Sequence, residues 1–277
     1  MLLNPFTYHS PKTIEEASNL FGQLSRARFL AGGTFLINNL KSLKRRNLAT
    51  PDHIVSLKKI SGLHEIKLSS NKLDIGSMTT LDQIIQNKDI EQKYPILKQV
   101  AENIATTQIR NMATIGGNVC CRYTWAEFAS CLIALEATLC FHEKGEEIKV
   151  LAEDFYKNSA KSKGILTKIS INLQENANIV YQRASKTSGV DVPMLTVCIK
   201  AQIENKKIKN IFFIINDGSS FSKRDLNVES ALKDAAIQEL EEKAINSIDF
   251  SSYALDTDYK KDLLKAHIKY AIQKLKK

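Results

Sequence analysis

Two short runs with paired glycines constrain the fold of this chain more than any other feature of its sequence. The first is FLAGGT at residues 29–34, and the second is ATIGGN at residues 113–118. Each run follows apolar residues and ends in a small polar side chain, which is typical of a tight loop whose backbone N–H groups face an anion. Either run alone would suit an ordinary turn. Together they predict that two distant segments converge on the pyrophosphate of one cofactor.

The composition is that of an ordinary globular protein. The chain has 277 residues, of which 43% are hydrophobic and 25% charged. Its formal net charge of +9 comes partly from residues 41–46 and 260–277, which we interpret as solvated helix faces rather than as a nucleic-acid surface. The start has no basic and apolar leader, and no apolar run is long enough to cross a bilayer. We therefore expect a soluble, cytoplasmic protein that binds neither nucleic acid nor membrane.

The spacing of cysteines and histidines predicts no metal site and no catalytic residue. The five histidines are scattered, without a companion at a meaningful spacing. The cysteines are odd in number and lack the C-x-x-C spacing of zinc or iron–sulfur ligands, so we expect free, mostly buried thiols at Cys120, Cys121, Cys131, Cys140 and Cys198.

Antiparallel strand pairs with flanking helices predict an α+β fold rather than a Rossmann domain, and Gly-x-Gly-x-x-Gly is absent. Strands are expected at residues 28–31, 52–57, 65–68, 72–76, 179–185, 194–204 and 208–216. Helices are expected from residue 14, from residue 95, and at residues 81–86, 128–139, 228–243 and 258–275. A polar connector at residues 174–178 predicts a boundary between residues 1–173, with subdomains of about 1–57 and 58–173, and a C-terminal domain at residues 174–277.

The residues around both glycine runs resemble a known family, the FAD-binding subunits of molybdenum hydroxylases such as xanthine dehydrogenase and carbon monoxide dehydrogenase. The resemblance rests on AGGT at residues 31–34, on QIRN at residues 108–111 leading into ATIGGN, and on LIAL at residues 132–135. It implies a two-subdomain FAD-binding fold of the PCMH or vanillyl-alcohol-oxidase-like type. It also implies a C-terminal α+β domain with a three-stranded antiparallel sheet.

The same resemblance implies a non-covalent FAD and a set of contact residues. Two departures from the family pattern affect it: Phe35 stands where relatives carry an acidic or polar residue, and Glu127 replaces an Asp after RYTW at residues 122–125 instead of a Ser-Pro stretch. Leu166 and Arg183 are matched to positions near the flavin ring, although Gln182 could take the basic position. The implied contacts are Leu30, Ala31, Gly32, Gly33, Thr34, Phe35, Leu36, Ile104, Ala105, Thr114, Gly116, Gly117, Asn118, Cys121, Ala126, Glu127, Leu166 and Arg183.

Some of these residues also have simpler interpretations. Glu127 could instead face the N-terminal dipole of the helix that follows it. Arg183 could be a charge on a strand surface. Arg110 and Asn111, which precede the second glycine run, could cap a helix C-terminus rather than contact the cofactor.

The resemblance implies an electron-transfer role. Electrons would reach FAD from the 2Fe–2S clusters of a small partner subunit, after a molybdopterin-binding large subunit oxidises the substrate, and would leave to NAD+ or another acceptor. Two alternatives stay open. One is a self-sufficient FAD-dependent oxidase or reductase with the same FAD fold, and the other is a cofactor-free basic scaffold protein.

Overall fold

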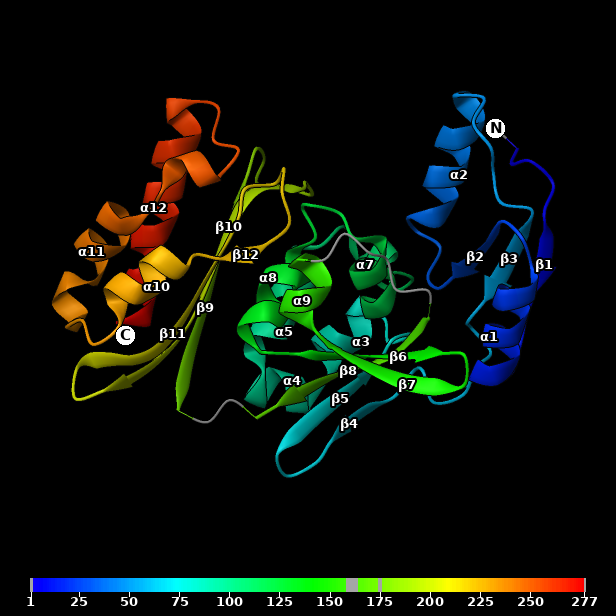
Figure 1. The fold of residues 1–277 in the computed structure, drawn as a ribbon, viewed down its shortest axis with the longest axis horizontal. Helices are drawn as coiled ribbons and strands as arrows, with labels where there is room; N and C mark the ends of the chain where they lie inside the picture. The colour runs from blue at the N-terminus through cyan, green and yellow to red at the C-terminus, as the bar shows by residue number, and fades with distance from the viewer. Residues whose placement is uncertain (1, 158–163, 174–175, 277) are drawn as a thin grey trace.

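The computed structural model describes residues 2–157, 164–173 and 176–276. These residues form three sheets that follow one another along the chain, each with its own helices. The second sheet and its helices lie between the first and third sheets (Figure 1). The connector expected at residues 174–178 lies partly outside the described residues.

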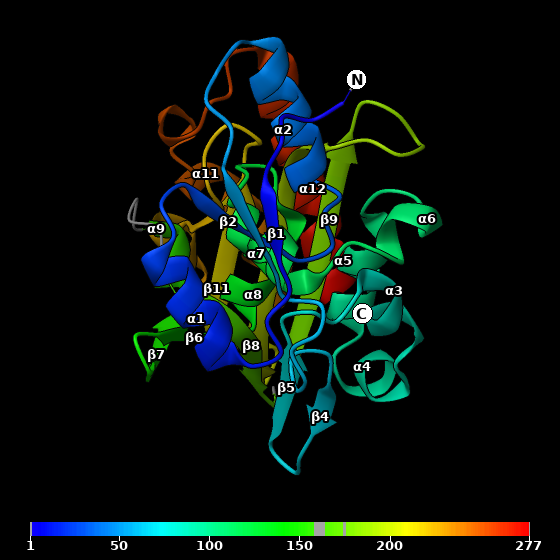
Figure 2. The same cartoon turned by 90° about the vertical axis from the view of Figure 1, so that its right-hand side faces the viewer.

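The first sheet is parallel, with the strand order β1-β3-β2. It consists of β1 (Thr7–His9), β2 (Ala27–Leu30) and β3 (His53–Ser56), and its helices are α1 (Ile14–Gln23) and α2 (Leu36–Arg45). Only antiparallel pairs were expected, but here α1 and α2 serve as the crossovers that parallel strands need. The two helices and β1 can be followed in Figure 2.

The second sheet is antiparallel, with the order β4-β5-β8-β6-β7. Its strands are β4 (Ile66–Leu68), β5 (Lys72–Gly76), β6 (Thr138–Glu143), β7 (Glu146–Leu151) and β8 (Ile165–Asn172). Its helices are α3 (Leu81–Gln86), α4 (Lys88–Lys93), α5 (Pro95–Asn103), α6 (Thr107–Arg110), α7 (Ile115–Cys121), α8 (Glu127–Ala134) and α9 (Ala152–Lys157).

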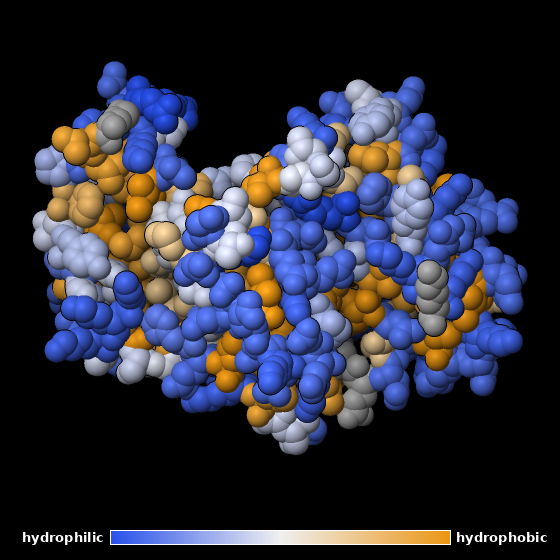
Figure 3. Space-filling view, turned by 180° about the vertical axis from the view of Figure 1, so that it is seen from behind, coloured by the Kyte–Doolittle hydropathy of each residue, from blue (hydrophilic) through white to orange (hydrophobic). Residues whose placement is uncertain are grey.

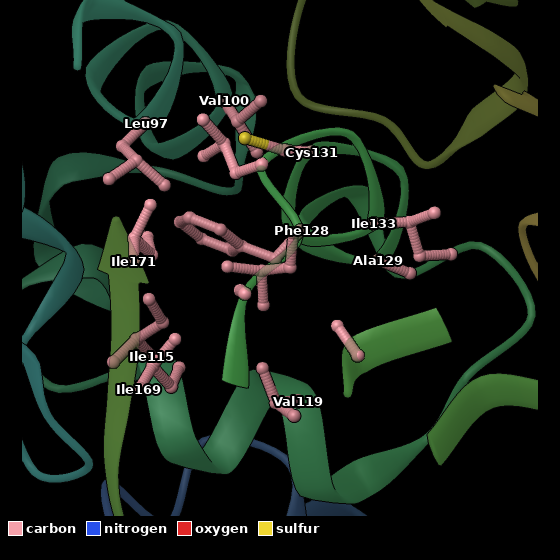
Figure 4. Close-up of a cluster of buried hydrophobic side chains, with 14 of the residues drawn as sticks. Leu97, Val100, Ile115, Val119, Phe128, Ala129, Cys131, Ile133, Ile169 and Ile171 are labelled. Carbon is pink, nitrogen blue, oxygen red and sulfur yellow. The ribbon is translucent and has the colours of Figure 1, made fainter. Parts of the chain in front are cut away.

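Helix α8 runs through the centre of the main hydrophobic core. Phe128 of α8 packs among Leu97 and Val100 of α5 and Ile171 of β8 (Figure 4). The helix expected over residues 128–139 is shorter than predicted, because α8 ends at Ala134 and the chain enters β6 at residue 138. A continuous apolar run is compatible with a buried helix and with a buried strand, so the pattern alone did not reveal the switch.

The third sheet is antiparallel and has four strands, not the three expected, in the order β12-β11-β10-β9. Its strands are β9 (Ala177–Ser185), β10 (Pro193–Glu204), β11 (Lys207–Asn216) and the two-residue β12 (Lys223–Arg224). Strands β10 and β11 pair antiparallel as a hairpin. Its turn residues Asn205 and Lys206 have φ values of 50° and 61°, as a tight hairpin turn requires.

The C-terminal helices cover the third sheet. They are α10 (Leu226–Leu232), α11 (Leu240–Ser247) and α12 (Asp258–Leu275), with short 3-10 turns at Ile237–Glu239 and Phe250–Ser252. The single helix expected over residues 228–243 is wrong, because the chain turns at Asp234 with a φ of 60°. Helix α12 has the predicted bounds. Among the described residues, no helix is long and apolar enough to cross a membrane.

The second and third sheets share one hydrophobic core, to which Tyr181, Cys198 and Ile214 of the third sheet contribute. The first sheet has a separate, smaller cluster built around Ala17, Val55 and Leu57, which also reaches Ile165 of β8. Figure 3, which views the molecule from behind, shows a hollow in the surface between the lobe of the first sheet and the rest of the molecule. Both glycine runs belong to segments at this junction.

Candidate functional site

The two glycine runs lie against each other, as the sequence predicted. A Cβ built on Gly32 would lie 2.8 Å from the carbonyl carbon of Met112 and 3.1 Å from the Cα atom of Ala113. A Cβ built on Gly117 would lie 3.7 Å from the Cβ atom of Ala31. Two segments far apart in the sequence therefore meet at one place.

The first run forms an open loop whose N–H groups are bare. It connects the end of β2 at Leu30 to the start of α2 at Leu36. Within the described part of the chain, the backbone N–H groups of residues 32–35 donate no hydrogen bond. The loop carbonyls are used instead: those of Gly33 and Phe35 accept the N–H groups of Ile37 and Asn39, at 3.1 and 2.9 Å.

This loop has the properties of an anion-binding concavity. Gly33 has a φ of 75°, a left-handed conformation that favours glycine. Helix α2 begins directly after the loop, and its N-cap residue, Phe35, provides no side-chain hydrogen bond. Successive bare N–H groups next to a helix N-terminus attract a phosphate oxygen through both hydrogen bonding and the helix dipole.

The second run is not a loop, which corrects the sequence-based expectation. Thr114 is the N-cap of α7, and its hydroxyl accepts the N–H group of Gly117 at 3.0 Å. The N–H groups of Gly116 and Asn118 donate to the carbonyls of Ser77 and Thr114, both at 2.9 Å. Because the protein itself accepts all three N–H groups, they do not face an anion.

The glycines of the second run permit close packing instead. A Cβ on Gly116 would lie 2.6 Å from the Cβ atom of Ser77, so the start of α7 can approach this segment only without a side chain there. The signal was present in the sequence, since a threonine three residues before a glycine N–H has the spacing of a helix N-cap.

Buried polar atoms without a partner surround the start of α7. Within the described residues, Asn118 Oδ1, Ser77 Oγ and Thr79 Oγ1 are buried and form no hydrogen bond. Buried side-chain oxygens are nearly always bonded to protein, water or a ligand, so these three atoms can accept a hydrogen bond from water or from a bound ligand. The next turn of α7 is internally bonded, because Cys121 Sγ donates to the carbonyl of Asn118 at 3.0 Å.

Ile104 and Ala105 lie in the connection between α5 and α6. Arg110 Nη1 donates to their carbonyls at 3.1 and 2.8 Å and to that of Glu102 at 3.2 Å. Arg110 therefore caps the C-terminal end of α5, and Asn111 is the C-cap of α6. The capping interpretation of these two residues is confirmed.

Glu127 and Arg183 bind each other. The carboxylate of Glu127, at the start of α8 just after the buried Ala126, accepts a hydrogen bond from Tyr181 Oη at 2.7 Å and from Arg183 Nε at 3.1 Å. Burial raises the pKa of Glu127, and the hydrogen bond from Tyr181 and the charge of Arg183 offset this only in part. The side chain of Arg183 is 12% exposed, so its interpretation as a surface charge is wrong.

Tyr181 was not singled out in the sequence, although it lies two positions before Arg183 and therefore on the same face of β9. Leu166, the other residue matched to the flavin-ring region, is 4% exposed and belongs to the main core.

Three aromatic rings lie beside the first run. Phe35 meets Tyr123 edge-on, with ring centroids 4.6 Å apart, and Tyr123 stacks on Trp125 at 4.1 Å. We call Phe35, Tyr123 and Trp125 the aromatic stack. The ring of Phe35 thus packs on protein, and its two partners come from the RYTW stretch that departs from the family pattern.

Residues 4–173 match the family described as "FAD binding domain in molybdopterin dehydrogenase", and the chain belongs to this family. The glyceraldehyde dehydrogenase medium chain of Sulfolobus acidocaldarius is 27% identical over 210 residues, which cover 74% of this chain and 73% of that relative. The carbon monoxide dehydrogenase medium chain of Hydrogenophaga pseudoflava is 32% identical over 152 residues, or 54% of this chain and about half (52%) of the relative.

A solved structure shows the same fold over nearly the whole chain. The reconstituted carbon monoxide dehydrogenase from Oligotropha carboxidovorans superimposes with a TM-score of 0.87 at 24% identity and covers 99% of this chain and 98% of that one. The chain is therefore a mixed α/β protein with an FAD-binding fold. The bare N–H groups of residues 32–35 and the unpartnered Asn118 Oδ1 fit an FAD, whose phosphates accept and whose hydroxyls donate hydrogen bonds.

Proposed function

We propose that this chain is the FAD-carrying electron-transfer subunit of a multi-subunit molybdenum hydroxylase. The observation that carries the proposal is the row of bare N–H groups at residues 32–35, placed against the second glycine run in a chain of an FAD-binding family. Bound FAD supplies the redox chemistry, since it can take up and pass on electrons singly or in pairs. The contacts proposed from the sequence remain a proposal.

The two runs have different roles in the proposed binding of the cofactor. The first run hydrogen-bonds the pyrophosphate through N–H groups that no acceptor among the described residues uses. The second run shapes the opposite wall: Gly117 leaves room beside Ala31, and Asn118 Oδ1 offers an acceptor for a hydroxyl of the cofactor. The proposed binding is therefore non-covalent.

The proposed partners are a molybdopterin-binding large subunit and a small subunit with 2Fe–2S clusters, with NAD+ or another molecule as the final acceptor. Support comes from the relatives, which are named as the medium chains of a glyceraldehyde dehydrogenase and of a carbon monoxide dehydrogenase. Their substrates differ, glyceraldehyde in one name and carbon monoxide in the other. A xanthine dehydrogenase-type complex is the specific form that we propose. The free cysteines suit a reducing compartment such as the cytoplasm.

The test measures flavin reduction in the purified chain loaded with FAD, under anaerobic conditions. With the chain alone, a heterocyclic substrate such as xanthine should leave the flavin absorbance unchanged. With both partner subunits added, the same substrate should bleach it. Bleaching of the chain alone would favour a self-sufficient flavoenzyme, and a chain that takes up no FAD would contradict the proposal.

A further inference from the structure

Hydrogen bonds join the first glycine loop to α2, because the carbonyls of Gly33, Thr34 and Phe35 accept from Ile37 N–H, Asn38 Nδ2 and Asn39 N–H. These bonds stay within the first lobe, and within the described residues the N–H groups of residues 32–35 donate none that would tie the loop to the rest of the protein. At its N-terminal end the loop rests against Met112, through Gly32. At its C-terminal end, the side-chain contact of Phe35 with Tyr123 joins the loop to the body of the protein.

Tyr123 is presented by a segment that is anchored on both sides. On one side, the guanidinium of Arg122 lies over the ring of Phe155 and over that of Phe221, with its Cζ atom 5.0 Å from each ring centroid. On the other side, Thr124 Oγ1 donates to the carbonyl of Gly218 at 2.8 Å, and Asn216 Nδ2 donates to the carbonyl of Thr124 at 2.6 Å.

The anchors lie in α9, at the end of β11 and in the turn that follows β11. Tyr123 therefore takes its position from the second and third sheets, whereas Phe35 belongs to the first. The ring contact between them spans the junction at which the two glycine runs meet. Phe35 and Trp125 remain 36% and 37% exposed, so neither ring is part of a core that would hold it in place for other reasons.

We infer that Tyr123 is a positioning residue for FAD: its ring, backed by Trp125, holds Phe35 and thereby fixes the loop in the geometry that presents its N–H groups to the pyrophosphate. The inference rests on the proposed function. A loop fixed before binding loses less freedom when the ligand arrives, which favours affinity.

The experiment measures the affinity of the apo-protein for FAD by calorimetric titration. The variants are Phe35→Leu, Tyr123→Leu and the double variant, each compared with wild type. An edge-on or stacked aromatic pair contributes about 0.5–1.5 kcal/mol beyond its buried area, so each single variant should raise the Kd about two- to twelvefold. Because both changes remove the same contact, the double variant should bind no more weakly than the weaker single variant.

Two further variants separate positioning from general stability. Tyr123→Phe keeps the ring and should keep the wild-type Kd. Phe21→Leu removes another stacked pair of the first lobe, in which the rings of Phe21 and Phe29 lie 4.1 Å apart, and should leave the Kd within about twofold. Trp125 is the only tryptophan of the chain, so its emission should also change when FAD binds.

The outcomes are distinguishable. If wild type binds FAD but Phe35→Leu and Tyr123→Leu bind it equally well, the inference is wrong and the proposed function stands. If Phe21→Leu weakens binding as much as they do, the stack has only a general structural role, and the inference is also wrong. If wild type binds no FAD, the proposed function fails and the inference fails with it.

Discussion

Gly32 lies directly against the main chain of Met112, where the two glycine runs meet. A Cβ at residue 32 would collide with the carbonyl oxygen of Met112 and lie 2.8 Å from its carbonyl carbon. Both are backbone atoms, so no flexible side chain can move aside. The position of the bare N–H groups therefore depends on residue 32 having no side chain.

Gly32→Ala should displace the first loop and lower FAD affinity at least about tenfold, the equivalent of 1.4 kcal/mol. Overpacking of this kind costs about 1–3 kcal/mol of unfolding free energy, so the variant should still fold. The matched control is Gly22→Ala in α1, where an added Cβ meets nothing within 4 Å. The flavin content of the two purified variants, with circular dichroism, checks this prediction. Full flavin occupancy in Gly32→Ala would contradict it.

Thr114→Val should destabilise the start of α7. It removes the hydroxyl that accepts the N–H group of Gly117, and Thr114 is 3% exposed. Loss of an N-cap costs about 1 kcal/mol, and a buried N–H group without a partner adds to this. Thr114→Ser keeps the acceptor and should retain most of the stability. Urea unfolding of the two variants measures the difference, and equal midpoints would show that the cap contributes nothing.

Asn118→Asp should weaken FAD binding, because the new carboxylate repels the negatively charged phosphates of the cofactor. We expect a loss of at least about tenfold, the equivalent of 1.4 kcal/mol. Asn118 Oδ1 has no partner within the described residues, so the charge would also be poorly compensated. Asn87→Asp makes the same change at the N-cap of α4, where either residue accepts the N–H group of Ile90. Titration with FAD compares the two, and equal losses would point to net charge rather than to the site.

The pair of Glu127 and Arg183 predicts a pH dependence. Burial raises the pKa of Glu127 above 4.5, so the folded protein holds this proton more tightly than the unfolded chain does. The contribution of Glu127 to stability is therefore fully present below pH 4.5 and is lost as pH rises through the folded pKa. Above that pKa, Glu127→Gln should equal or exceed the stability of wild type, by up to about 1 kcal/mol.

Arg183→Met should behave differently, because it leaves the buried carboxylate of Glu127 with only the hydrogen bond from Tyr181. Near neutral pH this should cost about 3 kcal/mol, and the loss should shrink as acid protonates Glu127. Denaturant unfolding across the pH range measures both variants. A wild-type protein that gains stability over Glu127→Gln as pH rises would contradict the assignment.

The sequence predicted the bounds of those elements whose ends are marked by a pattern in neighbouring residues. Helix α12 was expected over its observed bounds because its apolar stripe, which includes Leu264, Ile268 and Ala271, continues without a break. The end of α8, by contrast, follows from tertiary contacts, since the apolar run continues through it into β6. The two-residue strand β12 is too short to leave a pattern in the sequence.

The sequence also predicted the candidate site only in part. The meeting of the two glycine runs was predicted, but their different roles were not, because whether an N–H group is free depends on acceptors such as the Ser77 carbonyl, far away in the sequence. The contact of Glu127 with Arg183 joins residues 56 positions apart, and the stacking of Tyr123 against Phe35 joins two lobes. No local spacing encodes such contacts.

Residues 32–35 are proposed to bind the pyrophosphate of FAD. Titration of wild type and of Gly32→Ala with FAD and with FMN, which has a single phosphate and no adenylate half, examines this binding itself. We expect wild type to bind one FAD per chain, to release it intact on denaturation and to bind FMN at least about tenfold more weakly, and we expect Gly32→Ala to lose this preference. Equal affinity of wild type for FAD and FMN, or an FAD affinity unchanged by Gly32→Ala, would contradict it.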